Sequence, residues 1–487
     1  MEYRRKMKIK FSNLGSIQET ELDLRPLTVI IGPNNSNKTY IAYSIYGLWQ
    51  RAGRTLRIQG NEKLEIKHQE DDTWSLKIDN DLLDFFIRDI ETTAKNFRRK
   101  TLESFFQDSS RRLFSKTSFE MIISRQEVED AINQLIQQDP FPLTDRTSLK
   151  ISRKEDVLIF TIQPDDEEIT TNQRPNFTGG FRQFNDRPDL VFIFSVKQLL
   201  FYNTFPFPAE RNAFINTYKI LETKRYRILK QKQRESFINS TSEETFDLVK
   251  ESIDIRYPQP VEDFLDFLSD INLQEEIEKG YSSDKNEFQK LADEIENQLQ
   301  NKNKTILKFT HLGRTEIKVL VKTGLEIDLY NASSSIKQLA PLLLYLRYRA
   351  SKGDFLVIDE PEMNLHPESQ AKLLESLAIL VNLGVRILLT THSPYIMAHL
   401  NNLVNGNHEN SEILKRQSSS LYLQDERAFL PIDKVSAYEM KDNKLVSLND
   451  PDYGIRWDTL SDVSVDIQQK FFQIYQAGQE KADETED

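Results

Sequence analysis

The first part of the chain alternates hydrophobic and polar residues in a way that predicts strands. Residues 7–11 (MKIKF) and 20–24 (TELDL) alternate from one residue to the next, which is typical of half-buried strands. Residues 27–31 (LTVII) form a short apolar run that ends at Gly32, as expected for a short buried strand. From 40 to 53 the apolar residues recur at helical spacing. The pattern therefore predicts a buried strand, a glycine turn and a helix in direct succession.

Two later apolar runs predict buried strands that end in polar, chemically useful side chains. Residues 354–361 (DFLVIDEP) end in the acids Asp359 and Glu360, and residues 385–396 (VRILLTTHSPYI) pass through His392. An α/β sheet presents such residues at the carboxyl ends of its strands, where ligands bind. Asp359 is then a candidate Mg²⁺ ligand, Glu360 a candidate base for an attacking water, and His392 a candidate phosphate sensor. The alternatives are solvated acids at a strand end and a histidine with an ordinary structural role.

The loop at 31–40, IGPNNSNKTY, has the arrangement of a phosphate-binding loop. A glycine turn between a strand and a helix directs backbone N–H groups and the positive end of the helix at one point. In this interpretation Lys38 reaches the β- and γ-phosphates of a nucleotide, and the Thr39 hydroxyl binds Mg²⁺. Asn37 stands where the pattern has its last glycine, and asparagine tolerates left-handed backbone better than most residues. A polar turn with a solvated lysine is the competing interpretation.

A serine-rich segment at 332–338 (ASSSIKQ) precedes an apolar helical run, LAPLLLYLRYRA. Serines at a helix start can cap the helix, or they can bind an anion through their hydroxyls and the free N–H groups. Pro341 is expected within the first turns of this helix, where proline is tolerated. Taken alone, the segment favours a simple cap.

Composition places the chain among soluble globular proteins with polar helices. Of its 487 residues 29% are charged and 38% hydrophobic, and the net charge of −12 argues against nucleic-acid binding over the whole surface. The chain contains no cysteine, which excludes disulfides, thiolate metal sites and a cysteine nucleophile and fits a reducing compartment. The basic start is not followed by the apolar core of a signal peptide, and no apolar run approaches the roughly 18 residues that span a bilayer. We expect a cytoplasmic protein with no membrane partner.

The order of these motifs resembles that of the ABC-type ATPase heads of SMC-like proteins, of the OLD (overcoming lysogenisation defect) proteins and of several bacterial anti-phage systems. IGPNNSNKT resembles the Walker A motif, ASSSIKQ a degenerate signature motif, FLVIDEP the Walker B motif, EMNLHP the D-loop region and LLTTHSP the segment of the switch histidine. PAER at 208–211 is similar to a motif of the OLD-like and anti-phage branch. The resemblance implies an α/β fold: an ABC-type P-loop NTPase head with a mixed sheet and an inserted helical arm.

The resemblance also implies ATP and Mg²⁺ as cofactors. It assigns Mg²⁺ to Thr39 and Asp359, and it assigns catalysis to Glu360 and His392. The residues that it implies in nucleotide binding are Gly32, Asn34, Asn35, Ser36, Asn37, Lys38, Thr39, Tyr40, Arg211, Ser333, Ser334, Ser335 and Lys337. The chain departs from the family pattern where Asn37 and Ser335 replace glycines and Ala332 replaces leucine. These departures predict slow hydrolysis, or tight binding with rare turnover.

Partners are implied by the same resemblance. In the family the signature of one head completes the site of the other, which implies a head-to-head homodimer or a higher homo-oligomer. After His392 the chain shows neither the acidic D-x-D pair of a Toprim nuclease nor a histidine-rich nuclease signature. A head without an effector domain resembles the ATPase subunits of Septu-, PARIS- and retron-associated systems. It predicts a separate effector protein, for which a nuclease is the first expectation.

Three functions remain open at the level of sequence. The first is an ATPase that assembles with an effector and controls it in anti-phage defence. The second is a non-catalytic, nucleotide-gated scaffold. The third is an SMC-like ATPase of DNA repair, although the lack of a sustained heptad repeat argues against a long coiled coil. Basic clusters at 95–116 and 224–234 could contact DNA or RNA, or they could be solvated helix faces.

The patterns divide the chain into six segments. They are an N-terminal part of the ATPase head at 1–80, a helical insertion at 81–140, head strands and a loop at 141–211, a helical arm at 212–304, a C-terminal part of the head at 305–440 and a C-terminal helical tail at 441–487.

Overall fold

The computed structural model describes most of the chain. The described residues are 7–54, 66–69, 73–110, 112–138, 140–142, 147–164, 188–221, 223, 257–271, 286–309, 315–456, 466 and 468–474. The basic segment at 224–234 and Arg111 of the other basic cluster lie outside them. Within the described residues no helix is both long enough and apolar enough to cross a membrane.

A six-stranded sheet forms the core of the structure. Its strands, in spatial order, are β10 (Thr204–Phe207), β14 (Phe355–Asp359), β15 (Arg386–Thr391), β3 (Leu27–Ile31), β16 (Val435–Lys441) and β17 (Lys444–Ser447). Neighbouring strands run parallel except β16 and β17, so the sheet is mixed and the fold is α/β, as predicted. The three apolar runs seen in the sequence become adjacent strands, and their carboxyl ends share one edge of the sheet.

Side chains alternate between the two faces of this sheet and enter two separate hydrophobic clusters. On β3, Leu27, Val29 and Ile31 belong to one cluster, whereas Ile30 belongs to the other. The helices whose side chains enter the first cluster include α11 (Ser334–Tyr348), α12 (Pro367–Asn382) and α13 (Pro394–Asn405). Those of the second cluster include α1 (Lys38–Arg54) and α5 (Pro188–Leu200). Because both faces are buried, these strands read as continuous apolar runs.

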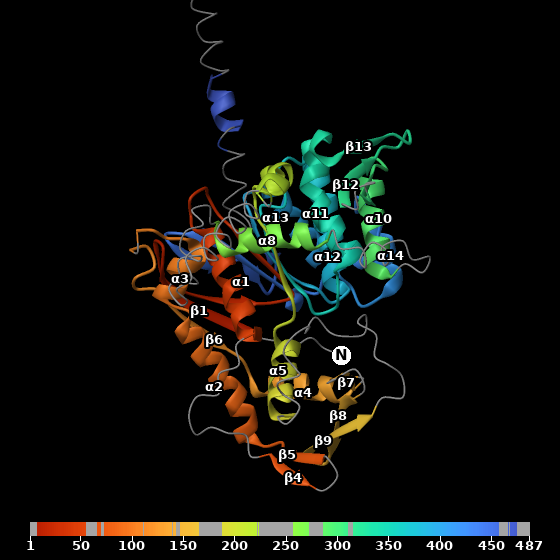
Figure 1. Ribbon diagram of the computed structural model, residues 1–487. Helices are drawn as coiled ribbons and strands as arrows, with labels where there is room; N and C mark the ends of the chain where they lie inside the picture. Colours follow the sequence, from red (N-terminus) through yellow and green to blue (C-terminus); the bar gives the residue numbers. More distant parts are fainter. Residues whose placement is uncertain are drawn as a thin grey trace, which may run out of the picture.

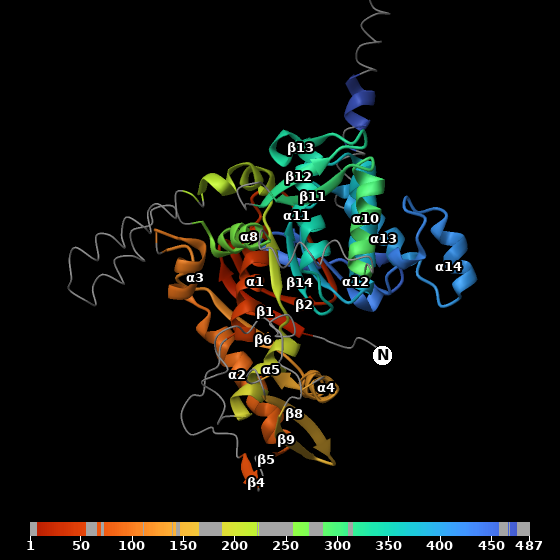
Figure 2. The ribbon, with the colours of Figure 1, turned by 45° about the vertical axis from the view of Figure 1, so that its right-hand side comes forward.

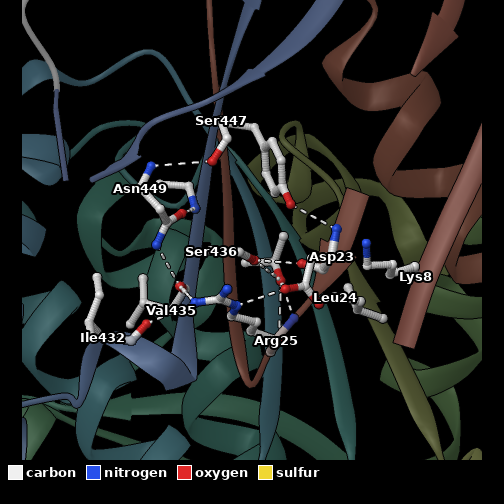
Figure 3. A network of polar contacts seen from close by, with 12 residues as sticks. Lys8, Asp23, Leu24, Arg25, Ile432, Val435, Ser436, Ser447 and Asn449 are labelled. Atoms are coloured by element: carbon white, nitrogen blue, oxygen red, sulfur yellow. Dashed lines mark hydrogen bonds and ion pairs between the residues drawn. The ribbon is translucent and has the colours of Figure 1, made fainter. Parts of the chain in front are cut away.

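The N-terminal hairpin belongs to a separate antiparallel sheet. Its strands, in spatial order, are β2 (Ile17–Leu24), β1 (Met7–Leu14) and β6 (Ser118–Ile122). Figure 3 shows the polar contacts that fix β16 beside β2: Arg25 Nη1 donates to the carbonyls of Ile432 and Val435, both at 3.0 Å, and Ser436 Oγ donates to the carbonyl of Asp23 at 2.7 Å. The hairpin is thereby held against the central sheet at the amino-terminal ends of β3 and β16.

The segment 81–140 was predicted to be a helical insertion, and this prediction is wrong in one part, because β6 lies within it. The helices of the segment are α2 (Asn80–Asn96), α3 (Arg99–Phe106) and α4 (Arg125–Ile136). In β6, Phe119 and Met121 are buried and alternate with exposed residues, and the strand pairs with β1. Five residues of alternation between helices are a weak signal, and the partner strand is more than a hundred positions away.

A five-stranded antiparallel sheet lies at the end of the molecule opposite β12 and β13 (Figures 1 and 2). Its strands, in spatial order, are β4 (Lys67–Gln69), β5 (Thr73–Lys77), β9 (Val157–Pro164), β8 (Thr147–Lys154) and β7 (Phe141–Pro142). The prediction that 141–211 holds head strands and a loop needs two corrections. Strands β8 and β9 do not join the central sheet, and residues 188–200 form the helix α5. Periodicity cannot distinguish a helix that is apolar on all sides from a buried strand, and α5 is packed between α1 and α4.

The described parts of the segment 212–304, predicted as a helical arm, pack against the head. Helix α8 (Gln259–Asp270) contacts β10, and α10 (Glu287–Leu299) contacts α11 and α12. A small antiparallel sheet follows, with β11 (Lys304–Phe309), β12 (Thr315–Leu320) and β13 (Glu326–Asp328), and the short helix η3 (Leu329–Asn331) leads into α11.

The C-terminal part is less helical than predicted. The segment 441–487 was expected to be a helical tail, yet it includes β17, β18 (Asn449–Asp450) and β19 (Gly454–Ile455) before the helical residues 468–474. The side chain of Asn449 binds the backbone of β16 through Ala437 and Val435, which holds this strand-rich stretch to the sheet edge. The other short elements are α14 (Ser411–Ser418), η4 (Glu426–Ala428) and η5 (Ile432–Lys434).

Candidate functional site

The loop between β3 and α1 takes the shape that the sequence predicts. Asn35 and Asn37 have left-handed backbone, with φ of 61° and 66°, and the Asn37 carbonyl accepts the first hydrogen bond of the helix from Ile41 at 3.1 Å. Asparagine tolerates this backbone region better than most residues do. At Gly32 an added Cβ would lie 2.7 Å from Cβ of Met440, so β16 passes too close for any other residue. The loop is thus compact and leads directly into the N-terminus of helix α1.

The side chain of Asn37 is directed at the turn between β1 and β2. Its Nδ2 donates to Ser16 Oγ at 2.6 Å, and Ser16 Oγ donates in turn to Asn443 Oδ1 at 2.8 Å. A Cβ added at Gly15 would lie 3.0 Å from Asn37 Oδ1, which shows how closely the amide sits on this turn. The residue that replaces the expected glycine therefore ties the loop to the N-terminal hairpin and to the turn after β16.

Lys38 is a buried cation at the centre of the loop, with 5% of its surface exposed. Its Nζ donates to the carbonyls of Pro33 at 2.8 Å and Gly32 at 3.1 Å, and it lies 3.0 Å from His392 Nε2. Burial lowers the pKa of Lys38, and the carboxylates of Glu360 and Asp359 oppose this shift. An ammonium held by carbonyls, a hydroxyl and an imidazole, all neutral or weakly charged groups, can exchange them for a phosphate, which binds it more strongly.

Thr39 and Asp359 form a pair at the start of α1 and the end of β14. Thr39 Oγ1 donates to Asp359 Oδ2 at 3.0 Å, and Thr390 Oγ1 donates to the other carboxylate oxygen. Burial raises the pKa of Asp359, and these two hydroxyls counteract the rise. A hydroxyl beside one carboxylate fits Mg²⁺, which takes few protein ligands and completes its shell with phosphate oxygens and water. Accordingly, no group of three or more His, Cys, Asp or Glu side chains able to hold a metal occurs in the described part of the chain.

Glu360 and His392 face each other from the ends of β14 and β15. The Glu360 Oε1 and His392 Nε2 atoms are 3.0 Å apart, and burial raises the pKa of Glu360. Glu360 also has a left-handed backbone, with φ of 48°, which is unusual for a glutamate and characteristic of functional sites. A carboxylate with a raised pKa that touches an imidazole suits general-base chemistry.

Glu362 is a site residue that the sequence analysis missed. Its Oε1 accepts hydrogen bonds from Thr391 Oγ1 at 2.6 Å and from the His392 backbone N–H at 2.7 Å. It therefore orients the strand end that presents the histidine. The available signal was its position in EMNLHP, directly after the Walker B-like acids, but nothing in the sequence indicates that its partner is the end of β15.

Arg211 was predicted to bind nucleotide, and the structure places its guanidinium among protein groups. The residue is 3% exposed and its hydrogen bonds go to protein: to the carbonyls of Pro208 and Asp359 through Nη1, and to that of Glu360 through Nη2. Burial lowers the pKa of Arg211 to about 10. The guanidinium thus lies behind the strand end rather than in the loop.

The other predicted nucleotide contacts divide into two groups. Ser36 belongs to the loop, where its Oγ donates to the Pro33 carbonyl at 2.8 Å, and Asn34 is exposed there. The Tyr40 side chain instead packs edge-on against Phe106 and Phe114. Only backbone atoms of Tyr40 are therefore in a position to serve the loop.

The serine-rich segment forms the start of α11, and its hydrogen bonds stay within that helix start and the residues just before it. Ser333 caps the helix through the Ile336 N–H at 3.4 Å and lies 3.0 Å from Ser335 Oγ, while Ser334 is exposed. Lys337 Nζ donates to a carbonyl, that of Tyr330, at 3.0 Å. Among the described residues no hydrogen bond joins this segment to the loop. Pro341 lies in the helix interior rather than in its first turns.

Comparison with known proteins identifies one family. The family described as "AAA ATPase domain" matches residues 7–397. Similar solved structures include the Smc head bound to the C-winged helix domain of ScpA, with a TM-score of 0.36, 12% identity and coverage of 91% of this chain and 96% of that chain. Another is the Smc head domain with an extended coiled coil bound to the C-terminal domain of ScpA, derived from Pyrococcus furiosus, with a TM-score of 0.33, 12% identity and coverage of 95% and 100%. None of the curated proteins matches the chain.

Proposed function

The chain belongs to the AAA ATPase domain family, and from this premise we propose that it binds and hydrolyses ATP at the loop between β3 and α1. One observation carries the proposal. Two short chains of contacts, Thr39 to Asp359 and Lys38 through His392 to Glu360, bring together residues that lie more than 300 positions apart. A cation, a hydroxyl–carboxylate pair and a base thus meet at the N-terminus of α1, and these are the groups that phosphoryl transfer requires.

In this proposal Lys38, Thr39 and the loop N–H groups hold the substrate. Lys38 gives up its carbonyl partners for the β- and γ-phosphates, and the start of α1 stabilises their charge. Thr39 and Asp359 would hold Mg²⁺, which when bound offsets the charge of the phosphate oxygens.

Glu360 would act as the general base of hydrolysis. It accepts a proton from the water that attacks the γ-phosphorus, the bond to the bridging oxygen breaks, and ADP and inorganic phosphate leave. The burial that raises the pKa of Glu360 makes its carboxylate a better proton acceptor near neutral pH. His392, which touches both Glu360 and Lys38, would report the presence of the γ-phosphate.

We further propose that two copies pair head to head. The start of α11 carries exposed or half-exposed serines and makes no hydrogen bond to the loop among the described residues, so its hydroxyls are available to a nucleotide held by a second copy. Nucleotide binding would then be coupled to dimerisation. Higher homo-oligomers and contact of the basic helices with DNA or RNA are compatible with this arrangement.

The biological role that we favour is control of a separate effector, with a nuclease as the expected partner, in anti-phage defence. It rests on the Septu-, PARIS- and OLD-like motif pattern of the sequence. A nucleotide-gated scaffold without turnover is the second candidate, because Asn37 and Ser335 replace the expected glycines. A DNA-repair ATPase is the third, and an adjacent effector gene would favour the first over both.

Two substitutions test the ATPase. Lys38→Ala is expected to abolish ATP binding, because the phosphates lose their buried cation. Glu360→Gln is expected to keep ATP binding, to stop turnover and to accumulate an ATP-bound dimer. Calorimetric titration, steady-state phosphate release and light scattering measure these three properties. Lys352→Ala, which removes an exposed lysine, is the matched control.

The outcomes separate the candidates. Unchanged ATP affinity in Lys38→Ala would remove this loop from the site. Parental turnover in Glu360→Gln would assign the base to another residue. ATP binding by the wild type without any phosphate release would favour the scaffold.

A further inference from the structure

A buried guanidinium lies behind the edge of the sheet that carries the candidate base. Arg211 follows β10, which pairs with β14, so the two strands end side by side. Its Nη1 donates to the Asp359 carbonyl at 2.8 Å and its Nη2 to the Glu360 carbonyl at 3.1 Å. These are the backbone atoms of the Mg²⁺ ligand and of the base that we propose. The arginine therefore binds the two successive peptide carbonyls that flank the Cα atom of Glu360.

The same guanidinium reaches α11. Its Nε donates to the backbone carbonyl of Gln338 at 3.3 Å. With its amide oxygen facing the guanidinium, the Gln338 side chain accepts from Arg211 Nη2 at 2.6 Å. Gln338 is 2% exposed and lies one turn after the serine-rich start of α11. One planar cation thus joins the end of β14 to the beginning of α11.

The backbone of Glu360 needs such a support. Its φ of 48° lies in the left-handed region, where the backbone of a residue other than glycine is strained. The Glu360 N–H donates to the Thr390 carbonyl at 3.1 Å, and its own carbonyl accepts from Arg211. Both sides of the residue are therefore fixed, and its carboxylate is directed at His392. A lysine could not replace the arginine, because a single ammonium lacks the planar fork that serves several acceptors at once.

We propose that Arg211 is a positioning residue that fixes Glu360 in its reactive orientation and couples this orientation to the serine-rich start of α11. The proposal rests on the assignment of Glu360 as the base. A nucleotide of a second copy that contacts Ser333 to Ser335 would shift α11, and Gln338 and Arg211 would pass this shift to the Glu360 backbone. Arg211 touches neither phosphate nor water in this scheme.

The kinetic test compares Arg211→Lys and Gln338→Leu with the wild type. For both variants we expect kcat to fall, by at least tenfold in Arg211→Lys, while ATP affinity stays within about threefold, because the loop and Lys38 are untouched. The double variant should be no slower than Arg211→Lys alone, since both changes break one connection. Parental kcat in Arg211→Lys, or equal losses of kcat and affinity, would overturn the proposal.

The matched control is Arg347→Lys. Like Arg211, Arg347 is a mostly buried arginine. It lies on α11 and binds Glu296 and Asp293 of α10 at 2.5 Å and 3.0 Å, away from the site. The substitution Arg347→Lys should lower the thermal stability of the protein without lowering kcat. A fall in kcat of the same size in this control would show that any weakening of α11 slows turnover and would remove the specific role of Arg211.

Hydrogen exchange tests the connection without relying on activity. In Arg211→Lys and in Gln338→Leu, we expect the backbone N–H groups of 355–362 and of 334–340 to lose protection together, while β3 stays protected. Unchanged protection in both segments would refute the coupling. A wild-type protein without ATP hydrolysis would instead refute the proposed function, and the exchange result would still decide whether the connection exists.

Discussion

Replacing Asn37 with glycine is expected to leave ATP binding intact and to change the stability of the protein very little. The backbone of Asn37 is left-handed, with φ of 66°, and glycine relieves the strain of this conformation by about 1 kcal/mol. The substitution also removes the exposed hydrogen bond from Asn37 to Ser16, worth about 0.5–1 kcal/mol, and frees the unfolded chain by about 0.4–1 kcal/mol. These terms nearly cancel, with a net loss of at most about 1 kcal/mol and a fall in Tm of about one degree.

Turnover is the informative readout. Because the amide of Asn37 is bound by Ser16, glycine removes no group that faces the phosphates and lets the loop close more freely. We therefore expect ATP affinity at or above the parental value and a phosphate-release rate that is equal or higher, with Lys38 and Glu360 still required. Calorimetric titration and steady-state kinetics measure the two quantities.

Ser16→Ala is the control for Asn37→Gly, since it removes the same hydrogen bond and leaves the asparagine in place. Suppose that Asn37→Gly loses both affinity and turnover by tenfold or more while Ser16→Ala behaves like the wild type. The amide would then contact nucleotide itself, and the interpretation of Asn37 as a tolerated replacement would be wrong. Similar losses in both variants would instead show that the tie to the hairpin is needed for a working loop.

Two further predictions concern the acids that flank β14, Glu362 after its end and Asp354 before its start. Glu362→Ala should lower kcat several-fold and spare ATP affinity, because the Thr391 and His392 groups lose their acceptor, and Glu362→Gln should restore most of the rate; equal rates in both variants would contradict this role. Burial raises the pKa of Asp354 to about 7, above its ordinary value of 3.8. Between these two values the folded protein binds a proton at Asp354 more readily than the unfolded chain does. The contribution of Asp354 to the free energy of unfolding therefore falls as the pH rises from about 4 to 7. The side chain in Asp354→Asn can still accept the hydrogen bond from the Tyr345 hydroxyl, so this variant should be more stable than the wild type at pH 8. In denaturant titrations the difference in the free energy of unfolding should shrink by up to about 1.4 kcal/mol per pH unit as the pH is lowered to 5. A difference that does not change with pH would refute the raised pKa of Asp354.

The central sheet could be predicted from sequence because its strands are buried on both faces. LTVII, FLVID and RILLTT are apolar runs that end at polar residues, and the structure places them in adjacent strands. Elements in a different environment were not predicted correctly. Helix α5 is apolar on all sides, so its letters suit a strand equally well, and β6 is a five-residue alternation whose partner, β1, is distant in sequence.

The candidate site followed the same division. Lys38, Thr39, Asp359, Glu360 and His392 could be named because loop, strand ends and helix tip dictate where such side chains meet. The roles of Glu362 and Arg211 could not be foreseen, because they depend on which backbone groups lie within reach in three dimensions. For Arg211 the motif PAER indicated importance, but its letters do not tell whether a guanidinium faces a phosphate or a peptide carbonyl.

The position of β3 in the sheet has a consequence for how the protein is made. Both neighbours of β3, the strands β15 and β16, come from residues 386–441, whereas β3 itself ends at Ile31. During synthesis β3 therefore waits with unpaired edges until residues 386–441 have left the ribosome, and such edges invite aggregation. Lys38 meets His392 only after β15 has inserted. The proposed nucleotide site can therefore form only after β15 is in place, so ATP bound there could not guide the earlier steps of folding.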